Sequence, residues 1–98
     1  MLTHIVVWKY REDVPAETRS EHVAQLSQLP SHITGIESFA VGSDVLRLER
    51  SYDTGLVAVF RDRDALEAYT IHPIHKNVAD FGRSISQHVA SVDFESES

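Results

Sequence analysis

The sequence predicts an α+β fold of the ferredoxin-like type, β-α-β-β-α-β, with a four-stranded antiparallel sheet and both helical segments on one of its faces. Three observations support this prediction. Segments rich in β-branched and aromatic residues and segments of helical periodicity follow one another in this order. The chain has 98 residues, enough for one domain, and its 42% hydrophobic and 24% charged residues are ordinary for a folded domain. We expect one domain over residues 1–95 and a short acidic tail at 96–98.

The first half of the chain is expected to supply a strand, a helix and a second strand. Residues 2–10, LTHIVVWKY, have the composition of a strand. Asp13 is a candidate N-cap and Pro15 suits a first helical turn, so a helix is expected to start there. Pro30 is expected to end that helix. The second strand is expected in GIESFAVGSDV, residues 35–45, where imperfect alternation indicates a bulge.

The second half is expected to supply the other elements: a polar connection at 47–55, a strand at 56–60, a helix from about Ala65 and a strand at 87–95. Asp62 or Asp64 can cap the helix, because a carboxylate oxygen can accept a hydrogen bond from a free N–H of the first turn. Pro73 is expected to interrupt the helix, which then resumes, because proline lacks the backbone donor and clashes with the preceding turn.

The first and third strands carry apolar residues on both faces. A sheet with one face in water alternates apolar and polar residues instead. The strand at 56–60, LVAVF, has no polar residue, and in the first strand both even and odd positions are apolar. The helices can cover only one face, so we expect a homodimer in which two sheets pack face to face as a dimeric α/β barrel. The alternative is a monomer with an exposed apolar sheet, a surface that invites aggregation.

Three features of the composition limit the function. The chain has no cysteine, which excludes disulfides, thiolate metal sites and cysteine nucleophiles. The net charge is −6 and the nine basic residues are scattered, which argues against nucleic acid as a partner. The first ten residues lack a basic leader, and their apolar run is too short for a signal core or a membrane span. We therefore expect a cytoplasmic protein that does not bind membranes.

The stretch AYTIHPIHKN, residues 68–77, carries Tyr69, His72 and His75 at intervals of three, with Pro73 between the histidines. These polar aromatic groups stand where an amphipathic helix would normally present leucines. Either these side chains form a reactive set that points into a cavity, or they belong to a helix that bends at the proline and is capped by its own side chains. Three other histidines are expected at the surface or rim: His22, His32 and His88.

Four pieces of sequence resemble the stress-responsive dimeric α/β-barrel (Dabb) domain family over nearly the whole chain. They are HIVVWKY near the start, GI-x-x-F-x-VG-x-D at 35–44, GLVAVFRDRDALEAYTIHPIH at 55–75 and, within it, Y-x-x-H-P-x-H at 69–75. The last of these is the most specific. The resemblance implies a ferredoxin-like homodimer, which agrees with the prediction made from the strands.

Many members of that family have no established reaction, but a plant polyketide cyclase among them shares the Y-x-x-H-P-x-H spacing and uses no metal or organic cofactor. The resemblance therefore implies a small-molecule ligand, no cofactor, no metal, and catalytic roles for Tyr69 and His75. It also implies a ligand-binding pocket lined by His4, Val6, Trp8, Val23, Leu26, His72 and Val78. The first helix differs from that of the cyclase, so we expect a smaller, more polar cavity and a different substrate.

The chemistry of the two catalytic candidates suits such a role. An imidazole at His75 can remove a proton next to a carbonyl, and a phenol at Tyr69 can donate to the oxyanion that develops. Three alternatives stay open: a non-catalytic, stress-related binding protein, a metal site formed by His4, His72 and His75, and a cofactor-free monooxygenase that uses Trp8. No carboxylate is clearly placed in the sequence to complete the metal site.

Overall fold

The computed structural model describes residues 1–97 and shows the predicted order of elements, with each helical segment divided in two. The elements are β1 (Leu2–Tyr10), α1 (Ala16–Ser27), α2 (Leu29–His32), β2 (Ile36–Ser43), β3 (Thr54–Phe60), α3 (Arg63–Ile71), α4 (Pro73–Ile85) and β4 (Ser86–Glu95). Of the expected acidic tail at 96–98, Ser98 lies outside the described residues. The N–H of Ser96 donates to the carbonyl oxygen of Met1 at 2.9 Å, which ties the start of the tail to the start of β1.

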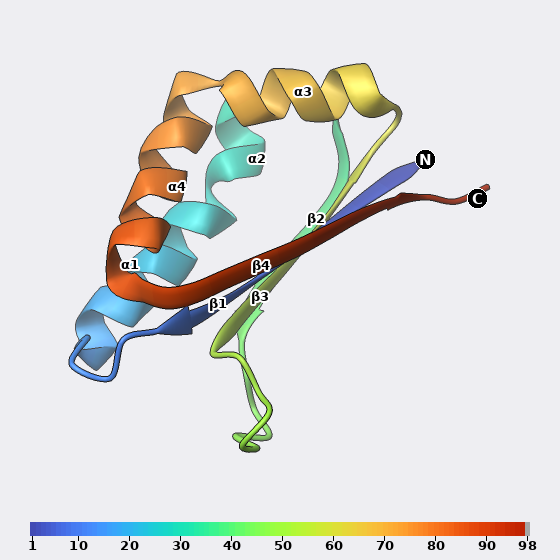
Figure 1. Ribbon diagram of the computed structural model, residues 1–98. Helices are drawn as coiled ribbons and strands as arrows, with labels where there is room; N and C mark the ends of the chain where they lie inside the picture. Colours follow the sequence, from blue (N-terminus) through green and yellow to red (C-terminus); the bar gives the residue numbers. More distant parts are fainter. Residues whose placement is uncertain (98) are drawn as a thin grey trace.

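The four strands form one antiparallel sheet in the order β2-β3-β1-β4. The helices lie on one side of this sheet (Figure 1). β1 pairs with both β3 and β4, so Ala58 and Asp93 lie on either side of His4, and Val89 lies beside Trp8. The predicted ferredoxin-like α+β fold is confirmed.

The first helical segment differs from the prediction at both ends. Pro15 takes the N-cap position of α1 and no side chain caps the helix, so the prediction for Asp13 was wrong. α1 ends at Ser27, and Pro30 lies in the first turn of the separate helix α2. A proline is tolerated there because the first N–H groups of a helix have no intrahelical acceptor. The prediction that Pro30 ends the helix was therefore also wrong.

The second helical segment follows the prediction. Asp62 caps α3, since its carboxylate accepts a hydrogen bond from the Ala65 N–H at 2.9 Å. α3 ends at Ile71, His72 has the extended backbone that is usual before proline, and α4 begins at Pro73. The predicted interruption is confirmed, and α4 leaves α3 in a new direction (Figure 1).

The hydrophobic core lies between the helices and the face of the sheet that they cover, here called the inner face. Its buried side chains include Leu2, Trp8, Tyr10, Leu56 and Phe60 from the sheet and Leu26, Leu29, Tyr69, Val78 and Ile85 from the helices. Each fully buried side chain of this size contributes about 1.5–3 kcal/mol to stability. The core thus fixes how α1, α3 and α4 sit on the sheet.

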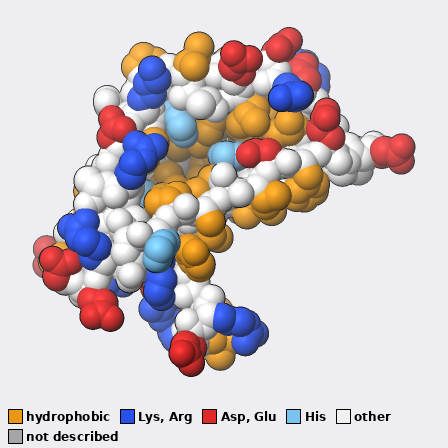
Figure 2. Space-filling view, in the orientation of Figure 1, with side chains coloured by type: hydrophobic (Ala, Val, Ile, Leu, Met, Phe, Trp, Pro, Cys, Tyr) orange, Lys and Arg blue, Asp and Glu red, His pale blue; other side chains and the backbone are white. Residues whose placement is uncertain are grey.

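The opposite side of the sheet, here called the outer face, is covered by no helix of the described chain and is apolar. Its apolar side chains are Ile5 and Val7 of β1, Val57 and Val59 of β3, and Val92 and Phe94 of β4. Val57 is 37% exposed, Val92 53% and Phe94 46%. Hydrophobic side chains gather along this side of the sheet in Figure 2. The prediction that β1 and β3 are apolar on both faces is confirmed, and β4 extends the outer patch.

Candidate functional site

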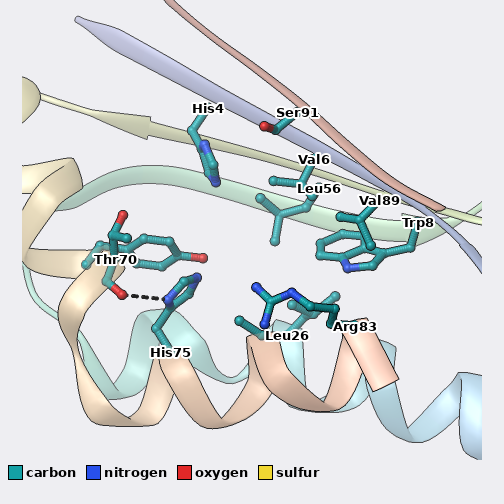
Figure 3. Close-up of a pocket in the computed structure, with 12 residues that line it drawn as sticks. His4, Val6, Trp8, Leu26, Leu56, Thr70, His75, Arg83, Val89 and Ser91 are labelled. Carbon is teal, nitrogen blue, oxygen red and sulfur yellow. Dashed lines mark hydrogen bonds between the residues drawn. The ribbon is translucent and has the colours of Figure 1, made fainter. Parts of the chain in front are cut away.

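A cavity of about 200 Å³ lies between the inner face and helices α1, α3 and α4, and it opens as a hollow in Figure 2. Its apolar wall consists of Val6, Trp8, Leu26, Leu56, Ala79 and Val89. Its polar groups are His4, Tyr69, Thr70, His75, Arg83 and Ser91 (Figure 3). Because an apolar cavity of roughly 150 Å³ already holds benzene, this one suits a molecule of about one ring with small substituents.

The break at Pro73 brings the two catalytic candidates together. Tyr69 stands near the end of α3 and His75 in the first turn of α4, and their ring centroids are 4.3 Å apart with an interplanar angle of 45°. In an unbroken helix, residues six positions apart would be separated by about 9 Å along the axis and would point in different directions. Both side chains instead line the same cavity.

His75 is oriented by a backbone carbonyl. Its Nδ1 lies 3.1 Å from the carbonyl oxygen of Thr70, which can only accept a hydrogen bond, so Nδ1 carries the proton. The other ring nitrogen, Nε2, faces the cavity (Figure 3). Burial lowers the pKa of His75 below its usual 6.5, and nearby positive charge acts in the same direction, against the opposing effect of the Thr70 bond. At pH 7, His75 is therefore a neutral imidazole with a lone pair on Nε2.

Tyr69 has the opposite protonation behaviour. The residue is 2% exposed, and its ring packs against those of Phe60 and His4. Burial raises the pKa of Tyr69 to about 12, so the phenol keeps its proton at neutral pH. Within residues 1–97 its hydroxyl has no hydrogen-bond partner, and the side chain lines the cavity. Tyr69 is thus a core aromatic whose hydroxyl is available to donate to a ligand.

His4 points from β1 towards the cavity (Figure 3). It is also paired with a carboxylate. Its Nδ1 contacts Oδ1 of Asp93, the residue directly opposite on β4. A carboxylate oxygen accepts, so Nδ1 of His4 donates and Nε2 is left for the cavity. Asp93 was not among the predicted residues, because only the pairing register reveals which residue of β4 stands opposite His4.

The structure places some of the predicted ligand-binding and catalytic residues at the cavity and others elsewhere. Those at the cavity are His4, Val6, Trp8, Leu26, Tyr69 and His75. Those outside its lining are Val23, His72 and Val78. His72 caps α4, since its Nδ1 accepts the Ile74 N–H at 3.1 Å, and Val78 packs in the core. Ligand binding by any of these residues stays a prediction.

Several lining residues were missed by sequence reasoning: Leu56, Thr70, Ala79, Arg83, Val89 and Ser91. Val89 and Ser91 belong to the inner face of β4 and follow from alternation once the register is known. Ala79 and Arg83 follow His75 by four and eight positions, which places all three on one side of α4. The signals were present, but the sequence did not show which side of each element faces the cavity.

His22 was expected at the surface or rim, and that prediction was wrong. The residue is fully buried, with Nδ1 hydrogen-bonded to the Tyr10 hydroxyl at 2.7 Å and the ring 5.0 Å from that of Trp8. Burial lowers the pKa of His22 to about 4. The missed signal is spacing: His22 precedes the buried Leu26 by four positions and therefore shares its side of α1. Gly82 of α4 leaves room for the imidazole, since a Cβ there would lie 2.5 Å from His22 Nε2.

The histidines that were considered as metal ligands do not converge. His72 caps α4 outside the cavity that His4 and His75 line. Among residues 1–97, no group of three His, Asp or Glu side chains is arranged to hold a metal ion. Nor does any helix of that range have the length and apolar character needed to cross a membrane.

Comparison with known sequences finds a family match and a relative from a plant. The sequence profile of the Stress Responsive A/B Barrel Domain family matches residues 2–96. An Arabidopsis thaliana protein, stress-response A/B barrel domain-containing protein At5g22580, is 27% identical over 94 residues. The aligned residues cover 93% of this chain and 82% of the Arabidopsis protein.

Comparison with solved structures supports the same fold. A dimeric ferredoxin-like protein of unknown function from Thermobifida fusca superposes with a TM-score of 0.87 at 25% identity, over 95% of this chain and 88% of that one. Hydroxynitrile lyase from Passiflora edulis gives a TM-score of 0.85 at 11% identity, over 95% of this chain and 90% of that one. At that identity the likeness shows the fold alone.

Proposed function

Because the family profile spans nearly the whole chain, this protein belongs to the Stress Responsive A/B Barrel Domain family, and we propose that it binds a small carbonyl-bearing molecule and performs cofactor-free acid–base chemistry on it. One observation carries this proposal. A neutral imidazole with a lone pair, His75, and a protonated phenol, Tyr69, line the same ring-sized cavity with their rings 4.3 Å apart. A base and a hydrogen-bond donor are the two groups that enolisation of a carbonyl compound needs.

The proposed reaction begins with proton transfer to His75. Nε2 takes a proton from the carbon next to the carbonyl. The electron pair of the C–H bond forms a C=C bond, and the π pair of the carbonyl moves to its oxygen. The Tyr69 hydroxyl donates a hydrogen bond to that developing oxyanion. His75 then returns the proton to another carbon of the conjugated enolate, which is an isomerisation. Alternatively, the enolate carbon attacks a second carbonyl of the same molecule, the first carbonyl re-forms, and the oxygen of the attacked carbonyl takes the proton from His75, which completes a cyclisation. General-base help contributes about 10²–10⁴-fold in rate, and one oxyanion donor about 10²–10³-fold.

The His4–Asp93 pair adds a second oriented imidazole to the same cavity, on the side of the sheet. Asp93 holds Nδ1 of His4, so Nε2 keeps a fixed direction towards the cavity. The His4 ring centroid lies 6.1 Å from that of Tyr69. His4 is therefore placed to hydrogen-bond a polar group of the ligand and to limit the poses in which its carbonyl meets Tyr69.

Two likenesses favour chemistry over simple binding. The segment Y-x-x-H-P-x-H at 69–75 resembles that of olivetolic acid cyclase, which catalyses an aldol condensation without a cofactor. The fold itself is used by an enzyme, since the Passiflora edulis protein is a hydroxynitrile lyase. The first helix differs from that of the cyclase, with His22, Val23 and Leu26 where aromatic residues wall its pocket, which favours a different substrate.

We also propose that the protein is a homodimer joined through the outer face. The Thermobifida fusca protein of the same fold is described as dimeric. In this chain the outer face presents apolar side chains from three strands to solvent, and Val92 and Phe94 are about half exposed. Burial of each such side chain against a second copy would contribute up to about 1.5–3 kcal/mol. A second sheet packed on the first would remove this patch from water.

Deuterium exchange into a small ketone tests the proposed chemistry. Acetophenone, one ring with an acetyl group, is incubated with the protein in D₂O, and loss of its methyl signal is followed by proton NMR. The wild type is expected to exceed the buffer rate, and His75→Asn and Tyr69→Phe are each expected to lose about 10²-fold of that enhancement. His32→Asn, which alters an exposed histidine of α2, serves as the control and is expected to match the wild type.

The outcomes separate the candidate functions. Exchange at the buffer rate, or full activity in His75→Asn, would overturn the acid–base proposal. Binding of acetophenone without exchange would favour the non-catalytic binding protein. Because the indole of Trp8 lines the cavity, oxygen uptake that is lost in Trp8→Phe would instead favour the cofactor-free monooxygenase.

A further inference from the structure

Arg83 is the one Lys, Arg, Asp or Glu side chain among the twelve residues that line the cavity in the described chain. We propose that the cavity selects a small organic acid, whose carboxylate is bound by Arg83 at the mouth while its apolar body lies against Val6, Trp8 and Leu56. This inference rests on the proposed function only in taking the cavity as a small-molecule site. The inference adds that the ligand is negatively charged, a property that Tyr69 and His75 do not determine.

The helix geometry aims Arg83 at the reactive groups. His75, Ala79 and Arg83 follow one another at intervals of four and lie on the cavity side of α4. Eight residues of helix span about 12 Å, and helical side chains lean towards the helix N-terminus, so the guanidinium reaches back over the small Ala79 towards His75. Figure 3 shows this direction of the Arg83 side chain.

The guanidinium is available to a ligand. It forms an ion pair with Asp80 on the same helix, between Nη1 and Oδ1 at 3.1 Å. The two side chains are 72% and 76% exposed, and surface pairs of this kind contribute only about 0–1 kcal/mol. Because a guanidinium carries five N–H donors, a carboxylate can take two of them without breaking every contact to Asp80. Arg83 can therefore bind a ligand carboxylate either in place of Asp80 or together with it.

The charge around the mouth favours an anion although the whole chain is acidic. The outer part of the mouth is lined by Lys76 and Arg83, with Asp80 as the one acid between them. The net charge of the chain is −6, so the protein as a whole repels anions. Recognition must then come from short-range contact with these basic groups, because longer-range charge effects are screened beyond about 10 Å at ordinary salt. The second carboxylate near the cavity, Asp93, is occupied by His4 at the opposite wall.

Paired probes of equal shape test this inference, and the chain contains its own reporter. Trp8 is the single tryptophan and lines the cavity, so its fluorescence reports occupancy. Titrations with benzoate and benzamide compare a carboxylate with a neutral amide on the same ring. The wild type is expected to bind benzoate about tenfold to a hundredfold more tightly than benzamide, the effect of charge-assisted hydrogen bonds.

Three variants make the test specific. Arg83→Gln is expected to lose the preference for benzoate and to keep the affinity for benzamide, because the apolar wall is unchanged. Arg83→Lys is expected to keep part of the preference, since it retains the charge but loses the planar pair of donors. Arg61→Gln removes the same charge at an exposed position that is not part of the cavity lining, and it is the matched control. It is expected to behave as the wild type.

The contrary results are equally defined. Equal binding of the two probes by the wild type, a preference that survives in Arg83→Gln, or no binding of either probe would overturn the inference. The acetophenone exchange test uses a neutral ketone and does not depend on Arg83. Exchange without a benzoate preference would therefore overturn only the anion site, and a benzoate preference without exchange would overturn only the acid–base proposal.

Discussion

The rings of Tyr69 and His75 lie 4.3 Å apart although the residues belong to different helices, on either side of Pro73. α3 ends just before the proline and α4 begins at it, so side chains from the last turn of α3 and the first turn of α4 lie next to each other and line the same cavity. Burial acts on the two groups in opposite ways: it raises the pKa of Tyr69 to about 12 and lowers the pKa of His75. A proton donor and a proton acceptor therefore coexist across the whole neutral range.

The rate of ketone exchange is expected to rise with pH and then level off. The pKa of His75 lies below 6.5, so the neutral base accumulates as the pH rises through a midpoint below that value. Tyr69, with a pKa of about 12, stays protonated over the range from pH 5 to 9 and adds no second transition. Initial exchange rates measured across this range test the expectation. A midpoint above 6.5, or a rate that falls as the pH rises, would contradict it.

His22 is expected to make the protein sensitive to acid. Its pKa is about 4 when folded and 6.5 when exposed, so below pH 6.5 the unfolded chain takes up a proton that the folded chain refuses. This contribution to stability is fully present above pH 6.5 and is lost as the pH falls towards 4, by roughly 3 kcal/mol at most. Urea unfolding at one protein concentration, repeated between pH 6.5 and 4, should show a smaller loss of the free energy of unfolding in His22→Gln than in the wild type. His32→Asn, which changes an exposed histidine, should follow the wild type. The same pH dependence of the free energy of unfolding in all three proteins would refute the prediction.

Gly82→Ala is expected to lower the free energy of unfolding by about 1–3 kcal/mol. A Cβ at this position would lie 2.5 Å from His22 Nε2 and 3.0 Å from Trp8 Nε1, and both rings are held in the core. The fluorescence of Trp8 during urea unfolding gives the measurement. Ser84→Ala, an exposed change on the same helix, should stay within about 0.5 kcal/mol of the wild type. An unchanged stability in Gly82→Ala would show that α4 does not pack this closely on α1.

Val92→Asp is expected to produce monomers, because it places a charge in the middle of the apolar outer face. The wild type should have twice the 11.0 kDa mass of the chain at micromolar concentration in sedimentation or light scattering. Ile71→Asp alters another exposed apolar residue, at the end of α3 and away from the outer face, and should leave the mass unchanged. A wild type of single-chain mass, or a Val92→Asp variant that stays dimeric, would contradict the proposed interface.

Local chemistry made much of the fold predictable from the sequence. Asp62 and Pro73 act on their own helix ends through backbone hydrogen bonds, so their effects could be stated without tertiary information. The two-sided apolar character of β1 and β3 is also visible in single segments. Pro30 misled us because the same residue type suits the start of a helix as well as its end.

The parts that could not be predicted depend on how elements pair and rotate. Asp93 reaches His4 only through the register of β1 with β4, and Arg83 reaches the cavity only because α4 turns this side towards the sheet. Val78 lies on the same helix but packs in the core outside the cavity lining. His22 was misplaced because histidine was counted as polar, although a buried hydroxyl, that of Tyr10, satisfies one of its nitrogens.

Histidine-selective ¹⁵N NMR of the free protein is the most direct test of the acid–base site, because it reads the protonation of His75 without any substrate. The structure predicts a neutral ring at pH 7 with the proton on Nδ1, bonded to the Thr70 carbonyl, and a titration midpoint below 6.5. A proton on Nε2, or a ring that is still charged at pH 7, would leave the cavity without a base and would contradict the proposed chemistry.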